Sequence, residues 1–176
     1  MTALKRTSTA ENWRAILPVR FTSSGLTSPS PSQELADLLA QRLLVHENRY
    51  SRELALDLVT SLGGSAISTP QASQLLKPVA ARGLVDEWNQ VRLAAILATR
   101  ALLEPRLHLC SSEDLDLVLP SLCFNRFNVA DGVRPVAQHA WTAVVKTKGA
   151  ELLQARRAKL VDFYVNMSRS NMDGDR

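Results

Sequence analysis

The chain has 176 residues, of which 45% are hydrophobic and 22% charged, with a formal net charge of +4. These values are ordinary for a globular protein, and no apolar run approaches the ~18 residues that a membrane-spanning helix requires. Residues 1–31 hold four basic residues against Glu11 alone, so they carry +3 of the net charge and the rest only +1. A nearly neutral body argues against a broadly basic nucleic-acid-binding groove.

Residues 1–31 differ in composition from the rest of the chain, because they are rich in Ser, Thr and Arg. Such a stretch is typical of a disordered tail, since it cannot bury enough apolar surface to order itself. It also contains a short apolar patch, made of Trp13, Ile16, Leu17, Val19 and Phe21. A docking peptide and an Arg- and Ser-rich mitochondrial presequence are therefore the alternatives.

Leu and Ala dominate after residue 31, and their spacing predicts helices. The first expected helix pair spans about 32–64 and ends at Gly63-Gly64, a common helix terminator. One helix of this pair has an apolar stripe made of Leu35, Leu38, Leu39 and Leu43. The other has an apolar stripe made of Leu54, Leu58, Val59 and Leu62.

The second pair is expected at about 69–104, with Thr69 as its cap, and the third at about 111–148, capped by Ser111 or Ser112. An incomplete fourth pair follows at about 151–176, with one helix over 151–168. Its open end is expected to expose an apolar face made of Leu152, Leu160 and Tyr164. That face would need a continuation or a partner, which suggests a fragment or a truncated isoform of a longer repeat protein.

Several features recur at an interval of 42 residues. Val91-Arg92 recurs as Val133-Arg134, Pro78 recurs as Pro120, and an Asp-Gly pair at 131 recurs at 173. A period in that range is typical of solenoids built from stacked helix pairs. A helical bundle with a chance period is the alternative.

This pattern resembles the HEAT repeat, a helix pair of the armadillo and HEAT superfamily, over roughly residues 32–176. In that family the first helix often carries a proline, as at Pro78 and Pro120. An Asp in the turn also precedes, by six residues, an Arg that follows Val in the second helix. Asp86, Val91 and Arg92 match this motif fully.

Elsewhere the motif matches in part. Asn128 stands where Asp is expected six residues before Arg134, and in the first pair His46 occupies that position before Arg52. The resemblance implies an all-α, right-handed α-α superhelix of about three and a half helix pairs. It also implies a structural ladder of Asp and Arg side chains through the stack, formed by Asp86, Arg92 and Arg134.

Catalytic motifs are missing from the sequence. His46, His108 and His139 are scattered, without metal-ligand spacing, and there is neither a phosphate-binding glycine loop nor a Gly-x-Ser-x-Gly turn. Cys110 and Cys123 lack a CxxC pattern and are expected to be small buried thiols in a reducing compartment. We therefore expect no enzyme activity, no metal and no cofactor.

One cluster of basic residues stands out near the C-terminus: Lys146, Lys148, Arg156, Arg157, Lys159 and Arg169. It is suited to contact phosphates or an acidic partner, although a solvated helix face is the alternative. Trp88 and Trp141 are expected to pack in the core or between repeats, whereas an exposed Trp88 would be an interface anchor.

The sequence thus predicts a scaffold or adaptor for protein–protein interaction, or a structural subunit of a larger assembly. Its partner-binding residues would be Trp88 and the basic cluster. Binding of nucleic acid or of an acidic partner through residues 146–169 is the alternative. A cytoplasmic location is expected, or a mitochondrial one if residues 1–31 form a presequence.

Overall fold

The computed structural model describes residues 31–64, 66–130 and 132–174, and the interpretations of residues 1–30 lie outside that range. All regular elements in the described residues are helical, which confirms the all-α prediction. α1 (Pro31–Leu38) continues through a π-helical turn (Leu39–Leu43) and is followed by α2 (Arg49–Gly63), α3 (Thr69–Ala81) and α4 (Asn89–Leu103). Then come α5 (Ser112–Asn125), α6 (Val133–Val145), the short α7 (Gly149–Ala155) and α8 (Arg157–Gly174).

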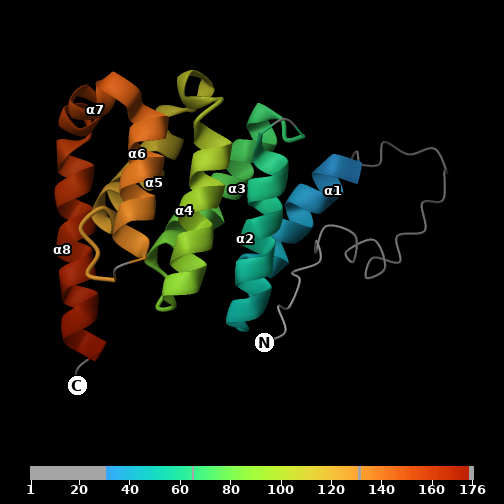
Figure 1. Ribbon diagram of the computed structural model, residues 1–176, viewed down its shortest axis with the longest axis horizontal. Coiled ribbons are helices and arrows are strands. Elements are labelled where there is room, and N and C mark those ends of the chain that lie inside the picture. The colour runs from blue at the N-terminus through green and yellow to red at the C-terminus, as the bar shows by residue number, and fades with distance from the viewer. Residues whose placement is uncertain (1–30, 65, 131, 175–176) are drawn as a thin grey trace, which may run out of the picture.

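The helices form two rows (Figure 1). α2, α4 and α6 pack side by side in one row, and α1, α3 and α5 pack side by side in the other. α8 extends the second row, because it packs against α5. The helices of each row follow one another in chain order, so α2 is the first helix of its row. Among the described residues, no helix of that row packs against the flank of α2 that is opposite to α4.

The core lies between the rows and is built from aliphatic side chains. Its largest fully buried members include Leu39, Leu75, Leu76, Leu119 and Leu122. Each such leucine stabilises the fold by about 1.5–3 kcal/mol through loss of apolar surface from water. Small residues in α4 and α6 let neighbouring helices approach closely, among them Ala94, Ala95, Ala98, Ala137 and Ala140.

Consecutive helix pairs are joined by hydrogen bonds between residues 41 positions apart. Gln33 Nε2 donates to Gln74 Oε1 over 2.9 Å, and Ser73 Oγ donates to Asp114 Oδ1 over 2.9 Å. Asn125, which is buried, donates from Nδ2 to the carbonyl oxygen of Leu84 over 2.8 Å. The spacing of these bonds is close to the interval of 42 residues seen in the sequence.

Helix boundaries differ from the predictions in two places. Ser68, rather than Thr69, caps α3, because its side chain and that of Gln71 form a reciprocal capping box. The helix expected over 151–168 is divided at Arg156, whose backbone leaves helical geometry at φ −114° and ψ 20°. Ser111 caps α5, as one of the two predicted alternatives, by accepting the backbone N–H of Asp114 over 3.1 Å.

Lys146 ends α6 with φ 51° and ψ −121°, a conformation that L side chains rarely adopt. Lys146→Gly is expected to raise the free energy of unfolding by about 1 kcal/mol, because glycine relieves the strain but has more entropy to lose. Urea unfolding followed by circular dichroism would measure the change. Lys146→Ala, which removes the charge and keeps the strain, should give no gain. An equal gain in both variants would contradict the backbone explanation.

Candidate interaction surface

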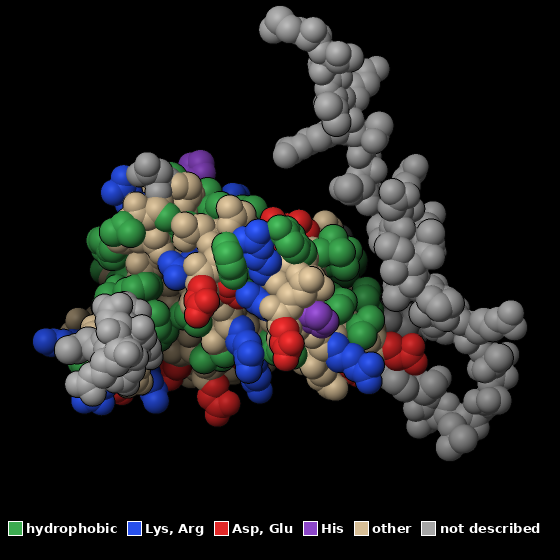
Figure 2. Space-filling view, turned by 90° about the horizontal axis from the view of Figure 1, so that it is seen from below, with side chains coloured by type: hydrophobic (Ala, Val, Ile, Leu, Met, Phe, Trp, Pro, Cys, Tyr) green, Lys and Arg blue, Asp and Glu red, His purple; other side chains and the backbone are tan. Residues whose placement is uncertain are grey.

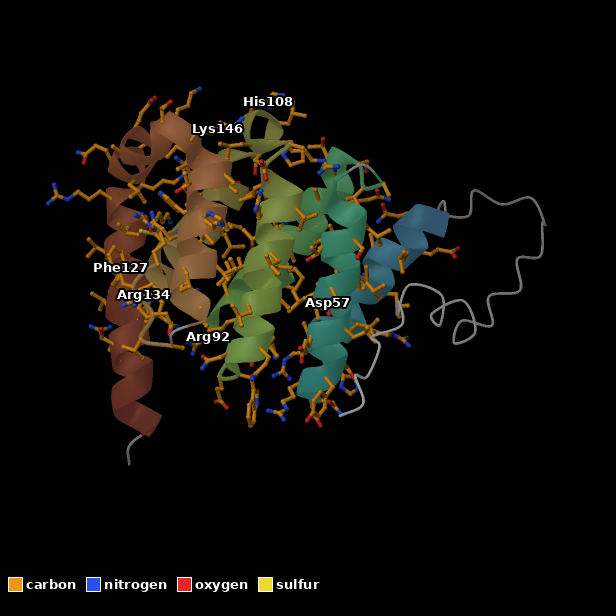
Figure 3. The ribbon with its side chains drawn as sticks, viewed as in Figure 1. Asp57, Arg92, His108, Phe127, Arg134 and Lys146 are labelled. Carbon is orange, nitrogen blue, oxygen red and sulfur yellow. The ribbon has the colours of Figure 1, made fainter. Side chains whose placement is uncertain are left out.

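The turns inside the first two helix pairs lie at the same edge of the molecule, which we call the turn edge and define as residues 45–52 and 82–92. At this edge the side chain of Asn48 caps α2 by accepting the backbone N–H of Tyr50 over 2.9 Å. His46 Nδ1 accepts the backbone N–H of Asn48 over 2.9 Å. Figure 3 shows Arg92 and Arg134 near the starts of α4 and α6, whereas His108 and Lys146 lie at the opposite edge.

An ion pair joins the two turns. Arg52 Nε lies 2.8 Å from Asp86 Oδ2, and Arg52 Nη2 donates to Asp86 Oδ1 over 3.1 Å. Arg52 Nη1 also donates to the carbonyl oxygens of His46 and Glu47 over 2.8 and 2.7 Å. The Arg52 and Asp86 side chains are only 15% and 7% exposed, so this two-pronged pair is partly shielded from water. It fixes the first turn against the second.

Asp86, Arg92 and Arg134 were expected to form a ladder of ion pairs through the stack. Among the described residues, the one ion pair that joins neighbouring turns is instead that of Arg52 with Asp86. Arg92 Nε donates to the backbone carbonyl of Asp86 in its own pair. Asn128, in the position of the next Asp, is uncharged and accepts the N–H of Ala130 over 2.9 Å. Arg134 is exposed and makes no hydrogen bond or ion pair with a described residue. Within the part of the chain that the structure describes, the ladder therefore does not continue at Asn128, where an amide stands in place of the carboxylate.

A stack of three side chains, two exposed aromatic rings and a half-buried arginine, lies beside the ion pair. The Arg49 guanidinium carbon is 3.9 Å from the centroid of the Trp88 ring and 4.6 Å from that of Tyr50. Arg49 Nη2 also donates to the Tyr50 hydroxyl over 2.7 Å. Trp88 is 46% exposed and Tyr50 62% exposed, which corrects the expectation that Trp88 packs internally. Trp88 is the extended N-cap residue of α4, so it lies outside the buried stripe of that helix.

The turn edge also contains a hollow of about 400 Å³ that is open to solvent. Its walls carry both signs of charge and are made by Val45, His46, Glu47, Arg52, Ala81, Arg82, Val85, Asp86 and Glu87. Figure 2 views the molecule from this side, where hydrophobic and basic side chains lie next to each other with acidic ones around them. The edge thus combines apolar, cationic and anionic groups.

The basic cluster predicted near the C-terminus is not one patch. Arg156 Nε lies 2.9 Å from Asp116 Oδ1 and its side chain is only 10% exposed, so it attaches the junction of α7 and α8 to α5. Arg169 lies twelve residues beyond Arg157 on α8, about 18 Å along the helix axis. The remaining members are exposed: Lys146, Lys148, Arg157 and Lys159.

The expected open apolar face at the end of the chain is corrected, because α8 packs against α5. Leu152 and Leu160 are partly buried and contact the core. The Tyr164 ring meets the Phe124 ring edge to face, with centroids 5.5 Å apart. Burial, followed by the proximity of Cys123 and a hydrogen bond to it, raises the pKa of Tyr164 to about 12, although Arg126 opposes the shift.

Trp141 packs internally, as expected, and is only 6% exposed. The Arg126 guanidinium carbon lies 4.8 Å from the centroid of its ring, and Arg126 Nε donates to Gln138 Oε1 over 2.9 Å. Arg126 and Gln138 thus give the outer side of α6 a polar covering.

Potential catalytic groups are dispersed. His46, His108 and His139 are exposed, Cys123 is buried, and Cys110 is half-buried. Burial, with a smaller contribution from Asp114, raises the pKa of the Cys110 thiol, although Arg106 opposes the shift. Within residues 31–64, 66–130 and 132–174, no three His, Cys, Asp or Glu side chains gather as a possible metal site.

Among the helices described, none contains a stretch that is both long enough and apolar enough to cross a membrane. No family model, curated protein or solved structure matches the chain.

Proposed function

We propose that the chain is a HEAT-like repeat protein that binds other proteins through its turn edge, as a scaffold, an adaptor or a structural subunit of an assembly. Consecutive helix pairs packed in two rows and the Arg52–Asp86 ion pair between neighbouring turns support this proposal. Stacked helix pairs present extended surfaces that are suited to macromolecular partners.

The stack of Arg49, Tyr50 and Trp88 is the observation that carries the proposal. Trp, Tyr and Arg are the residue types that contribute most to binding energy at protein interfaces. Because the guanidinium already contacts both rings and donates to the Tyr50 hydroxyl, less side-chain entropy remains to be lost on binding. The nearby hollow adds charged groups of both signs that can pair with a partner's side chains.

The proposal predicts that Trp88→Ala weakens binding of a protein partner at least about tenfold, as loss of an interface anchor does. The partner is first captured with the full-length chain, then purified and titrated against the wild-type and variant chains. Leu109→Ala is the matched control, because Leu109 is 54% exposed and lies near the opposite edge of the helices. The affinity of the Leu109→Ala variant for the partner should stay within about twofold of the wild-type value.

Two outcomes would contradict this function. One is a partner whose affinity is unchanged by both Trp88→Ala and Arg49→Ala. The other is capture that disappears after nuclease treatment, with affinity that falls steeply with salt and is weakened by Arg157→Glu and Lys159→Glu. The second result would favour nucleic-acid binding through residues 146–169 instead.

A further inference from the structure

The flank of α2 that faces away from α4 carries apolar side chains that no helix of the described residues covers. Leu54, predicted to belong to an apolar helix stripe, is 60% exposed, and Leu58 on the next turn is only partly buried. These two residues lie four apart and therefore on the same side of the helix. We call the surface formed by Glu53, Leu54, Asp57 and Leu58 the α2 flank.

The matching positions of α4, the next helix in the row, indicate the kind of contact that suits this flank. Arg52 in α2 and Arg92 in α4 occupy matching motif positions, 40 residues apart. The same offset places Ala94 and Ala98 at the positions of Leu54 and Leu58. These alanines are only 6% and 0% exposed. They share a face of α4 with Ala101, which closely approaches Gly63 of α2.

The face of α4 that is buried against α2 thus corresponds to the uncovered flank of α2 itself. Leu54 and Leu58 are larger than the matching alanines, so they present more apolar side-chain surface at these two positions than a face already buried elsewhere in the row. Terminal units of stacked repeats need a cover over such a face. An apolar segment that packs against the α2 flank would therefore remove Leu54 and Leu58 from water.

The flank also has an unbalanced negative charge. Glu53 and Asp57 are four residues apart on one helix, an arrangement in which like charges destabilise each other. Neither carboxylate forms an ion pair or hydrogen bond with a described residue. Burial raises the pKa of Asp57, because the loss of water around its carboxylate disfavours the charged form. Figure 3 labels Asp57 on α2. A covering segment with positive charge would offset both the repulsion between Glu53 and Asp57 and the cost of partly burying the Asp57 carboxylate.

The chain's own segment 13–21 has this composition. It places Arg14 and Arg20 among five apolar side chains, namely Trp13, Ile16, Leu17, Val19 and Phe21. The nine residues from 22 to 30 can span about 30 Å when extended. That distance exceeds the length of α1 with its π-helical turn, about 20 Å for thirteen residues. The segment can therefore reach α2, against which the π-helical turn packs.

We propose that residues 13–21 dock on the α2 flank of the same molecule, with their apolar side chains over Leu54 and Leu58 and their arginines toward Glu53 and Asp57. The match in charge and the short connection favour this segment over a second copy or another protein. This inference does not depend on the turn edge and would stand if the proposed partner binding failed.

Photo-crosslinking on the full-length chain tests the proposal. A p-benzoylphenylalanine in place of Leu54 should crosslink within one chain to residues 13–21, with a yield independent of protein concentration. The same probe in place of Leu109, which is similarly exposed and near the opposite edge, should give no such product. Trp13→Ser, Ile16→Ser and Leu17→Ser combined should lower the yield at least about tenfold, as expected when an apolar contact is lost.

A charge variant provides a second test that leaves the apolar residues in place. Arg14→Glu with Arg20→Glu should lower the yield, and adding Glu53→Lys with Asp57→Lys should restore part of it. Restoration is a result that general misfolding would not produce. Absence of a product at residues 13–21, a product between two chains that grows with concentration, or a yield unaffected by all these substitutions would overturn the proposal.

Discussion

Replacing Arg106 with methionine is expected to lower the free energy of unfolding by about 2–4 kcal/mol. Arg106 is 8% exposed and donates to the carbonyl oxygen of Gly63 at the end of α2. It also donates to the carbonyl oxygen of Ile67 over 2.6 Å, in the connection before α3. Methionine fills similar space but cannot donate, so both acceptors lose a charge-assisted bond. Urea unfolding followed by circular dichroism would give the difference.

Arg100→Met is the matched control for Arg106→Met. Arg100 lies six residues before Arg106, on α4, and pairs with Glu104 over 2.8 Å, but both side chains are about 40% exposed. Exposed pairs four residues apart on a helix contribute only about 0.3–0.5 kcal/mol. Similar losses in the two variants would show that the buried bonds of Arg106 contribute little. Arg106→Lys should fall between wild type and Arg106→Met, because an ammonium cannot reach both carbonyls at once.

The sequence predicted the helices well, because apolar spacing and caps act over a few residues. It placed Leu54, Leu58 and Val59 in one apolar helix stripe and did not distinguish their burial. The difference between them depends on which neighbour covers each face of α2. Leu54 is 60% exposed because no described helix lies there, whereas Val59 is fully buried against the rest of the stack.

The candidate site was predicted only in part for the same reason. A repeat motif singled out Asp86, and the structure places that carboxylate in an ion pair with Arg52 of the preceding pair. The stack around Arg49 could not be found from spacing, because Trp88 is 39 residues away and lies outside any helical stripe. Arg156 looked like one of several exposed cations until α8 packing brought it to Asp116. No local signal distinguishes a buried arginine such as Arg106 from its exposed neighbours.

Gly63→Ala is expected to destabilise the protein by about 1–3 kcal/mol, the usual range for overpacking a tight contact. A Cβ at Gly63 would lie 2.9 Å from the Cβ of Ala101 and 3.1 Å from its backbone carbon. Backbone cannot rotate away as a flexible side chain can, so α2 and α4 would have to separate. Gly63 was predicted as a helix terminator, yet neither it nor Gly64 has a positive φ. A glycine is needed at position 63 because α2 and α4 approach each other closely there.

Gly64→Ala is the matched control, because a Cβ at Gly64 meets nothing within 4 Å and its φ of −68° suits any residue. That variant should be neutral or more stable by about 0.4–1 kcal/mol, since alanine has less entropy to lose on folding. Gly63→Ala combined with Arg106→Met should cost less than the sum of the two single changes. Both disturb the same junction, since Arg106 bonds to the Gly63 carbonyl. Strict additivity would show instead that the α2–α4 contact and the Arg106 bonds stabilise the junction independently.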